Sequence, residues 1–68
     1  MMYRFNFHDV RDGGFIITRH YEHECDADAM MDARSRLCNR SWCDQVDIYR
    51  MASNDTCGLM SYVVSYTK

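Results

Sequence analysis

Three potential metal ligands fall within six residues in the segment His20-Tyr-Glu-His23-Glu-Cys25, and Cys38 and Cys43 follow further along the chain. Zinc binds four such side chains in a tetrahedron, so this segment is a candidate for part of a structural site. The spacing is not that of a zinc finger, ribbon or knuckle. His20 also falls on an expected strand while His23 and Cys25 follow it, so the sequence does not show that the three side chains converge. We therefore favour surface or interface histidines, and we predict no metal and no cofactor.

Cys25 with His23 or His20 is also the local candidate for a nucleophile and its general base. No glycine-rich segment that could form an oxyanion hole accompanies it, and a chain of 68 residues offers little concave volume for a substrate. Asp26 and Asp28 hint at a cation site, although helix capping explains them as well. We expect a protein that is not an enzyme.

The expected oxidation state of the cysteines depends on the cellular compartment of the protein. No apolar run approaches the length of a transmembrane helix, and the N-terminal residues lack the apolar stretch of a signal peptide. We expect the protein to be located in the cytoplasm of a host cell, without membrane contact. Reducing conditions there favour free thiols, while two disulfides or metal ligation stay open as alternatives. The four cysteines are Cys25, Cys38, Cys43 and Cys57.

The first part of the chain has the pattern of a β-hairpin. Residues 3–10 alternate between apolar and polar side chains, which is typical of a half-buried strand. Residues 11–14 include Asp-Gly-Gly and predict a tight turn. Residues 15–22 form the returning strand, with Ile17 and Tyr21 expected to point inward.

A helix is predicted near residues 26–39. Asp26 is suited to cap its N-terminus, and Asn39 is suited to a left-handed conformation just beyond its C-terminus. The apolar stripe expected to face a sheet consists of Ala29, Met30, Ala33 and Leu37.

Two further strands are expected at residues 45–51 and 59–66, joined by a turn at 53–55. Strict alternation on the last strand puts four residues on one side: Met60, Tyr62, Val64 and Tyr66. Residues 1–68 are thus predicted to form a single α+β domain in the order ββαββ. Its four-stranded, mainly antiparallel sheet carries one helix on one face and leaves the second face open.

Charge is segregated along the chain although the net charge is only −2. Acidic residues crowd the start of the helix and basic residues its end, and Asp32 and Arg36 are spaced to form an i,i+4 ion pair. This arrangement complements the helix dipole, or it forms a two-signed surface that docks a charged partner. The residues concerned are Glu22, Glu24, Asp26, Asp28, Asp32, Arg34, Arg36 and Arg40.

Two kinds of macromolecular partner fit this composition. Tyr49, Tyr62 and Tyr66 could stack nucleic-acid bases on an open sheet face, yet acidic residues outnumber basic ones by 10 to 8. Direct nucleic-acid binding is therefore the less favoured class. Tyrosine, methionine, tryptophan and arginine are enriched in protein interfaces, and we favour a protein partner. A homodimer is compatible with the exposed edges of such a sheet.

Three segments carry a resemblance of layout: Tyr-Arg-Phe-Asn-Phe-His-Asp-Val at 3–10, Ala-Asp-Ala-Met-Met-Asp-Ala-Arg-Ser-Arg-Leu at 27–37, and Val-Asp-Ile-Tyr-Arg-Met at 46–51. Their order resembles that of small phage-encoded inhibitors, including some anti-CRISPR proteins. These inhibitors share no diagnostic motif, so the resemblance transfers no site residue. It implies a phage or mobile-element protein that occludes a host defence nucleoprotein complex without catalysis.

The leading hypothesis is such an inhibitor, and the alternative is a small nucleic-acid-binding or regulatory domain that uses an open aromatic sheet face. The expected partner is a host protein or nucleoprotein complex. Candidate binding residues are Glu22, Glu24, Asp28 and Asp32 for an acidic patch, Arg36 and Arg40 for a basic patch, and Tyr49 for the exposed sheet face.

Overall fold

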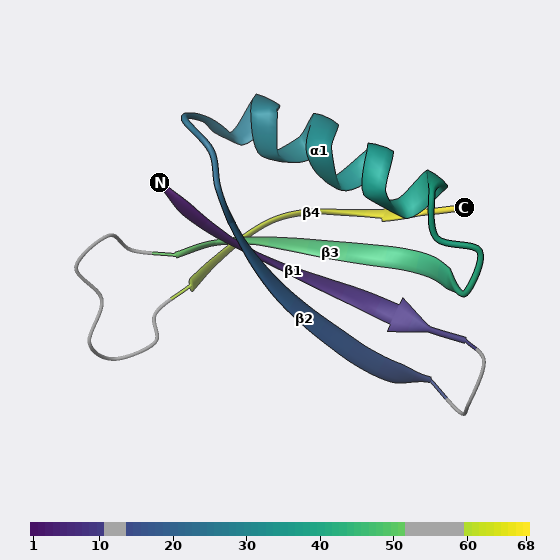
Figure 1. Cartoon of the computed structure of the whole chain (residues 1–68). Coiled ribbons are helices and arrows are strands. Elements are labelled where there is room, and N and C mark those ends of the chain that lie inside the picture. Colours follow the sequence, from purple (N-terminus) through teal and green to yellow (C-terminus); the bar gives the residue numbers. More distant parts are fainter. Residues whose placement is uncertain (11–13, 52–59) are drawn as a thin grey trace.

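The computed structural model describes residues 1–10, 14–51 and 60–68, and these form the predicted ββαββ arrangement (Figure 1). The elements in order are β1 (Met2–Asp9), β2 (Phe15–Glu22), α1 (Asp26–Cys38), β3 (Cys43–Met51) and β4 (Met60–Thr67). The turn predicted at 53–55, most of the turn at 11–14 and the expected start of the last strand at Leu59 lie outside the described residues.

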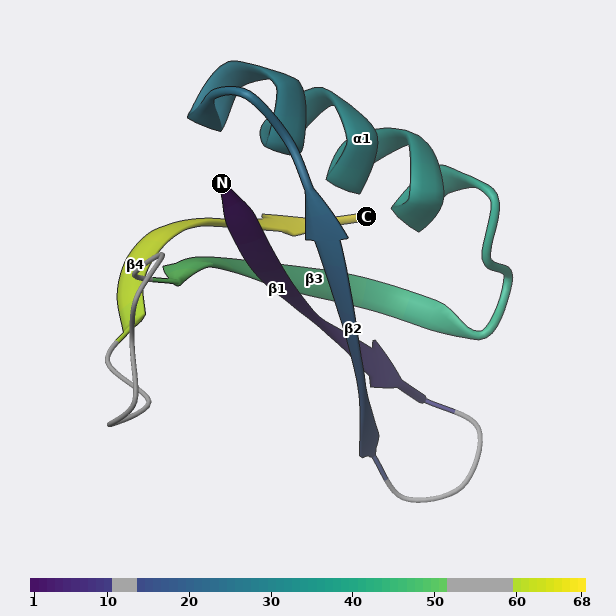
Figure 2. The same cartoon turned by 60° about the vertical axis from the view of Figure 1, so that its left-hand side comes forward.

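The four strands form one antiparallel sheet in the order β2-β1-β3-β4, so β1 and β3 are central and β2 and β4 are edges. The helix lies across one face of this sheet and packs mainly against β3, and the other face is left open by the described elements (Figures 1 and 2). The predicted fold class is confirmed.

The core lies between α1 and the central strands. Alternate residues from Tyr3 to Phe7 on β1, and Val46 and Ile48 on β3, point toward the helix and are fully buried, as period-two alternation requires. Small alanines on the buried stripe of α1 let the helix approach the sheet closely. Ile17 and Tyr21 on β2 are partly buried against this core, as predicted. The buried core consists of Tyr3, Phe5, Phe7, Ala29, Ala33, Leu37, Cys43, Val46 and Ile48.

A β-bulge interrupts the alternation of β4 at Val63. The register places Ile48 opposite Val64 and then Tyr49 opposite Tyr62, which leaves Val63 as an extra residue. Because one extra residue reverses the alternation, Val64 faces the helix and Tyr62 faces the open side of the sheet. The prediction that Tyr62 and Val64 share a side is wrong for this reason.

The start of α1 differs from the prediction. Cys25 takes the N-cap position with an extended backbone (φ −152°, ψ 169°), and no side chain of the described residues caps the helix. Asp26 is instead the first helical residue, and its carboxylate accepts hydrogen bonds from Tyr3 and Arg50 across the core boundary. The capping prediction is wrong because these tertiary donors compete with the first-turn N–H groups.

The end of α1 also differs. Asn39 has φ −86° and ψ −1°, which is right-handed rather than left-handed. Its N–H donates to the Ser35 carbonyl, and the N–H of Arg40 donates to the Leu37 carbonyl. A right-handed turn therefore satisfies these carbonyl groups, and no left-handed residue is needed.

Candidate functional site

The centre of the open sheet face is a hydrogen-bonded network around Asp47 on β3. Its Oδ1 accepts bonds from the Ser65 hydroxyl at 2.6 Å and the Gln45 amide at 2.9 Å, and its Oδ2 lies 2.7 Å from Nε2 of His8. Ser65 in turn accepts a 2.8 Å bond from the Tyr62 hydroxyl. Because the members come from β1, β3 and β4, the network fixes this surface across three strands.

The network sets the charge state of Asp47. Partial burial alone would raise the pKa of this carboxyl. Hydrogen bonds from Ser65, His8 and Gln45, together with the charge of His8, outweigh burial and hold the pKa below its usual value. Asp47 is therefore an anion at neutral pH, and it anchors the donors around it.

This cluster contains serine, histidine and aspartate, but its order is not that of a nucleophile and its base. In a catalytic triad the imidazole bonds directly to the hydroxyl that it activates. Here Asp47 lies between Ser65 and His8 and bonds to each of them. A carboxylate with a lowered pKa is a weak base, so the geometry fits a structural and binding role.

A second group on the open face surrounds Arg4, whose neighbours across the sheet are Tyr49 on β3 and His20 on β2. Nη1 of Arg4 lies 3.7 Å from the sulfur of Met60, and Nε is buried without a hydrogen-bond acceptor among the described residues. Tyr49 packs edge-on against Tyr62 with ring centroids 5.7 Å apart. We call Arg4, Tyr49, Met60 and Tyr62 the Arg4 patch.

The Arg4 patch has unused hydrogen-bonding capacity. A guanidinium carries five N–H donors, and a thioether sulfur is a weak acceptor. No described carboxylate forms an ion pair with Arg4. The Tyr62 side chain, 60% exposed, packs against Tyr49, the residue opposite Arg4 on β3. The patch can therefore bind a carboxylate or phosphate that is flanked by an apolar or flat group.

Three of the four predicted acidic residues are exposed near the end of β2 and the start of α1: Glu22, Glu24 and Asp28. Glu22 lies 3.9 Å from the N-terminal amine. Within the described ranges, Glu24 and Asp28 have no ion-pair partner. We call Glu22, Glu24 and Asp28 the acidic end.

Asp32 is the fourth predicted acidic residue and is held within the fold. Its two oxygens lie 2.8 Å from Nε of Arg36 and 2.8 Å from Nε2 of His23. Arg36 also stacks over the Tyr21 ring at 3.8 Å and donates to its hydroxyl at 3.1 Å. The predicted Asp32–Arg36 pair is confirmed, and this cluster links the helix to the end of β2.

Arg40, the second predicted basic residue, lies against the core instead of extending beside Arg36. Its guanidinium is 4.5 Å from the Phe7 ring centroid and donates to the Arg36 carbonyl at 3.1 Å. The structure therefore does not gather Arg36 and Arg40 into an exposed basic patch. Tyr49, by contrast, lies on the open face as expected.

Arg4, His8, Asp47 and Ser65 were not among the site residues predicted from the sequence. The outward positions of Arg4 and His8 follow from the alternation of apolar and polar side chains along residues 3–10. The sequence could not predict that these four side chains lie on one face near one another, because this depends on strand order and on the bulge at Val63.

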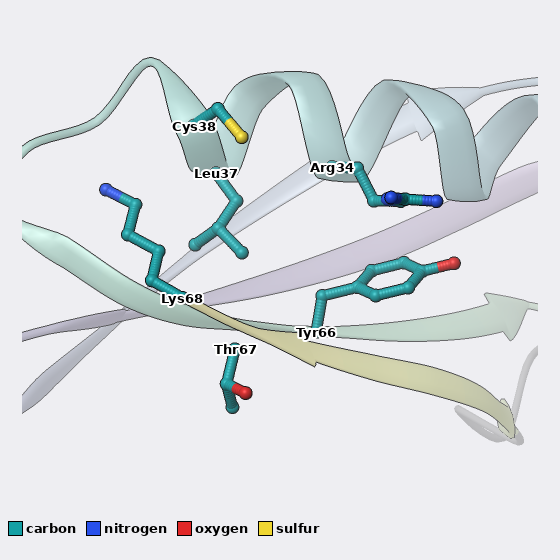
Figure 3. A pocket seen from close by; sticks show the side chains of 6 residues that line it. All are labelled: Arg34, Leu37, Cys38, Tyr66, Thr67 and Lys68. Atoms are coloured by element: carbon teal, nitrogen blue, oxygen red, sulfur yellow. The ribbon is translucent and has the colours of Figure 1, made fainter.

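A pocket of about 370 Å³ lies between the C-terminal half of α1 and the end of β4 (Figure 3). The Arg34 guanidinium covers the Tyr66 ring at 5.4 Å, and the Lys68 amine donates to the Arg40 carbonyl. Among the residues that the structure describes, no acidic side chain lines the pocket, and polar groups do not converge in it as a catalytic site requires. Its lining residues are Arg34, Leu37, Cys38, Tyr66, Thr67 and Lys68.

The candidate metal ligands are dispersed. His23 bonds to Asp32, His20 is exposed on β2, and Cys25 is an exposed free thiol at the start of the helix. Within the part of the chain that the structure describes, no three histidine, cysteine or acidic side chains gather as metal ligands would. Cys38 and Cys43 are also free, while Cys57 lies outside the described residues.

Neither the helix length nor comparison with known proteins assigns a function to this chain. The single helix within the described ranges falls short of the length and apolar character needed to cross a bilayer. No protein-family model, curated protein or solved structure matches this chain.

Proposed function

We propose that this protein is a non-enzymatic phage or mobile-element protein that binds a host defence nucleoprotein complex and blocks it, as anti-CRISPR proteins do. The observation that carries the proposal is the Arg4 patch, where a guanidinium without a described carboxylate partner lies across from Tyr49, which packs against the exposed Tyr62. Arginine and tyrosine are the residues that most often dominate binding energy at protein interfaces.

The surface around the patch is suited to occlusion because it is held rigidly. Hydrogen bonds of the Asp47 network fix Ser65 and Tyr62 relative to β3. A preorganised surface loses little conformational entropy on binding, which favours tight association by a small protein.

The acidic end gives a second contact for the same partner. Nucleoprotein complexes present basic residues along their nucleic-acid channels, and exposed carboxylates complement such residues. Glu24 and Asp28 have no described ion-pair partner, so their charges are available for this contact.

The proposal is tested with bacteria that carry defined CRISPR systems and express this chain. Phage should form plaques on at least one strain that otherwise resists infection, and the purified effector complex should bind the chain in biolayer interferometry. Arg4→Ala should weaken that binding by about tenfold, as loss of an interface hot spot does. Arg34→Ala, on the exposed surface of the helix, is the matched control and should change affinity less than about twofold.

The acidic end is tested separately with a triple variant, Glu22→Lys, Glu24→Lys and Asp28→Lys. Binding should weaken and lose its salt dependence if these carboxylates contact a basic surface. Unchanged affinity in this variant and in Arg4→Ala would reject both contacts. Failure of every effector complex to bind the wild-type chain would reject the proposed function.

A small nucleic-acid-binding or regulatory domain is the second candidate, and the Tyr49–Tyr62 pair beside Arg4 favours it. Aromatic rings on an open sheet stack single-stranded bases, and arginine binds their phosphates. Fluorescence anisotropy with single-stranded oligonucleotides at low ionic strength distinguishes it. Binding that weakens with salt and is lost in Tyr62→Ala would support this candidate.

A further inference from the structure

We infer that β2 pairs in antiparallel orientation with β2 of a second copy of this chain, so that the two sheets join edge to edge. This inference is independent of the proposed function. β2 is an outer strand of the sheet formed by the described residues, so one side of its backbone has no described strand partner. Unpaired N–H and C=O groups on an edge are a template for a further strand.

The edge of β2 is regular along its length. Its register with β1 runs without a shift from Met2 opposite Glu22 to Asp9 opposite Phe15. The chain contains no proline, so each residue of β2 retains its backbone N–H. Regular edges of this kind pair readily because neither a bulge nor a missing donor interrupts the hydrogen bonds.

Two large apolar side chains on β2 indicate the direction from which a partner approaches. Phe15 is 65% exposed and Ile16 is 55% exposed. They are successive residues, so they point to opposite faces of the sheet. A partner stacked on one face would cover only one of them. A strand added in the plane of the sheet lies beside both.

The opposite edge of the sheet is less suited to pairing. β4 carries the bulge at Val63 and ends beside a lysine, Lys68. Bulges and edge lysines are devices that block strand addition. Pairing of β2 with β4 of the next copy, which would give an open filament, is therefore disfavoured. Pairing of β2 with itself closes around a two-fold axis.

A two-fold axis through Thr18 gives a self-complementary register. It places Phe15 opposite Tyr21 of the second copy, Ile16 opposite His20, and Ile17 opposite Arg19, with Thr18 facing its own counterpart. No like charges lie directly opposite one another in this register. An axis through Arg19 would instead place two guanidinium groups opposite each other.

The test is sedimentation velocity of the full chain over increasing protein concentration. The wild type should shift from monomer to dimer, and Ile16→Lys should raise the dimer dissociation constant by at least about tenfold, since it brings two added charges to the edge. Met31→Lys, an equally drastic change at a 71% exposed helix position, should leave the dimer intact. A monomer at every concentration would overturn the inference.

Hydrogen exchange of the wild-type chain is a second test that does not depend on whether the Ile16→Lys variant folds. Amides of β2 should exchange more slowly as concentration rises, while those of the β4 edge should not change. Protection on β4, or a dimer that withstands Ile16→Lys in a variant with a native circular dichroism spectrum, would place the interface elsewhere and overturn the pairing.

Discussion

The Tyr3 hydroxyl on β1 donates a 2.5 Å hydrogen bond to Oδ1 of Asp26, the first residue of α1. Arg50 on β3 donates to the other carboxylate oxygen at 3.1 Å. Burial raises the pKa of Tyr3 to about 12, and the hydrogen bond to Asp26 and the charge of Asp26 add to this effect. The contact fixes where the helix begins relative to the two central strands.

Tyr3→Phe is expected to lower the free energy of unfolding by about 1–2 kcal/mol, because it removes a buried donor from a charged acceptor. Urea denaturation followed by circular dichroism measures the change. Tyr62→Phe is the matched control, since its hydroxyl is exposed and its loss should cost less than about 0.5 kcal/mol. Equal losses in the two variants would contradict the role assigned to the Tyr3 hydroxyl.

The raised pKa of Tyr3 predicts a loss of folding stability at alkaline pH. The folded pKa of Tyr3 is about 12 against an ordinary value of 10.0, so folding favours the neutral phenol. Its contribution is complete below pH 10.0 and disappears as pH rises toward about 12. The difference in unfolding free energy between wild type and Tyr3→Phe should shrink across this window. A constant difference would show that the Tyr3 pKa is not raised.

The lowered pKa of Asp47 predicts a loss of folding stability at acidic pH. Its folded pKa lies below the ordinary value of 3.8, so its contribution is present above that pH and is lost as pH falls through the folded pKa. Asp47→Asn should lower stability at neutral pH by about 1–3 kcal/mol, since it weakens bonds to a charged acceptor. The variant should also lose less stability on acidification.

Asp44→Asn is the control for the Asp47 experiment, because Asp44 is an exposed aspartate on the same strand. We expect it to change unfolding free energy by less than about 0.5 kcal/mol. Acid titrations that are the same for wild type and Asp47→Asn would reject the Asp47 network as a source of stability.

The thiols should differ in reactivity. Cys25 and Cys38 are exposed, whereas Cys43 is 1% exposed and donates its S–H to the Gln45 carbonyl. With Cys57 replaced by serine, Ellman's reagent should modify Cys25 and Cys38 rapidly in the folded protein. Modification of Cys43 should require denaturant. Rapid reaction of all three thiols without denaturant would contradict the buried position of Cys43.

Local sequence patterns were sufficient for the fold class. Alternation on the strands identified the buried face of β1, and the spacing of Ala29, Ala33 and Leu37 identified the buried stripe of α1. Both patterns record burial, which is the dominant free-energy term in folding. The Asp32–Arg36 ion pair was also predictable from the sequence, because residues four apart on a helix are neighbours in any context.

The helix ends and the candidate site depended on partners distant in sequence. Asp26 accepts from Tyr3 and Arg50 instead of capping its own helix, since those donors lie within reach only in the folded chain. Arg36 lies over Tyr21, so it does not form the predicted basic patch with Arg40.

The chain itself therefore determined the ββαββ order, the buried faces and the local ion pair, because these follow from the periodicity of neighbouring residues. Only the tertiary structure decided that Tyr62 joins Tyr49 and Arg4 on the open face, and that Asp47 collects donors from three strands. The physical reason is that one extra residue at Val63 reverses the side-chain direction of a strand, and strand order determines which outward groups meet.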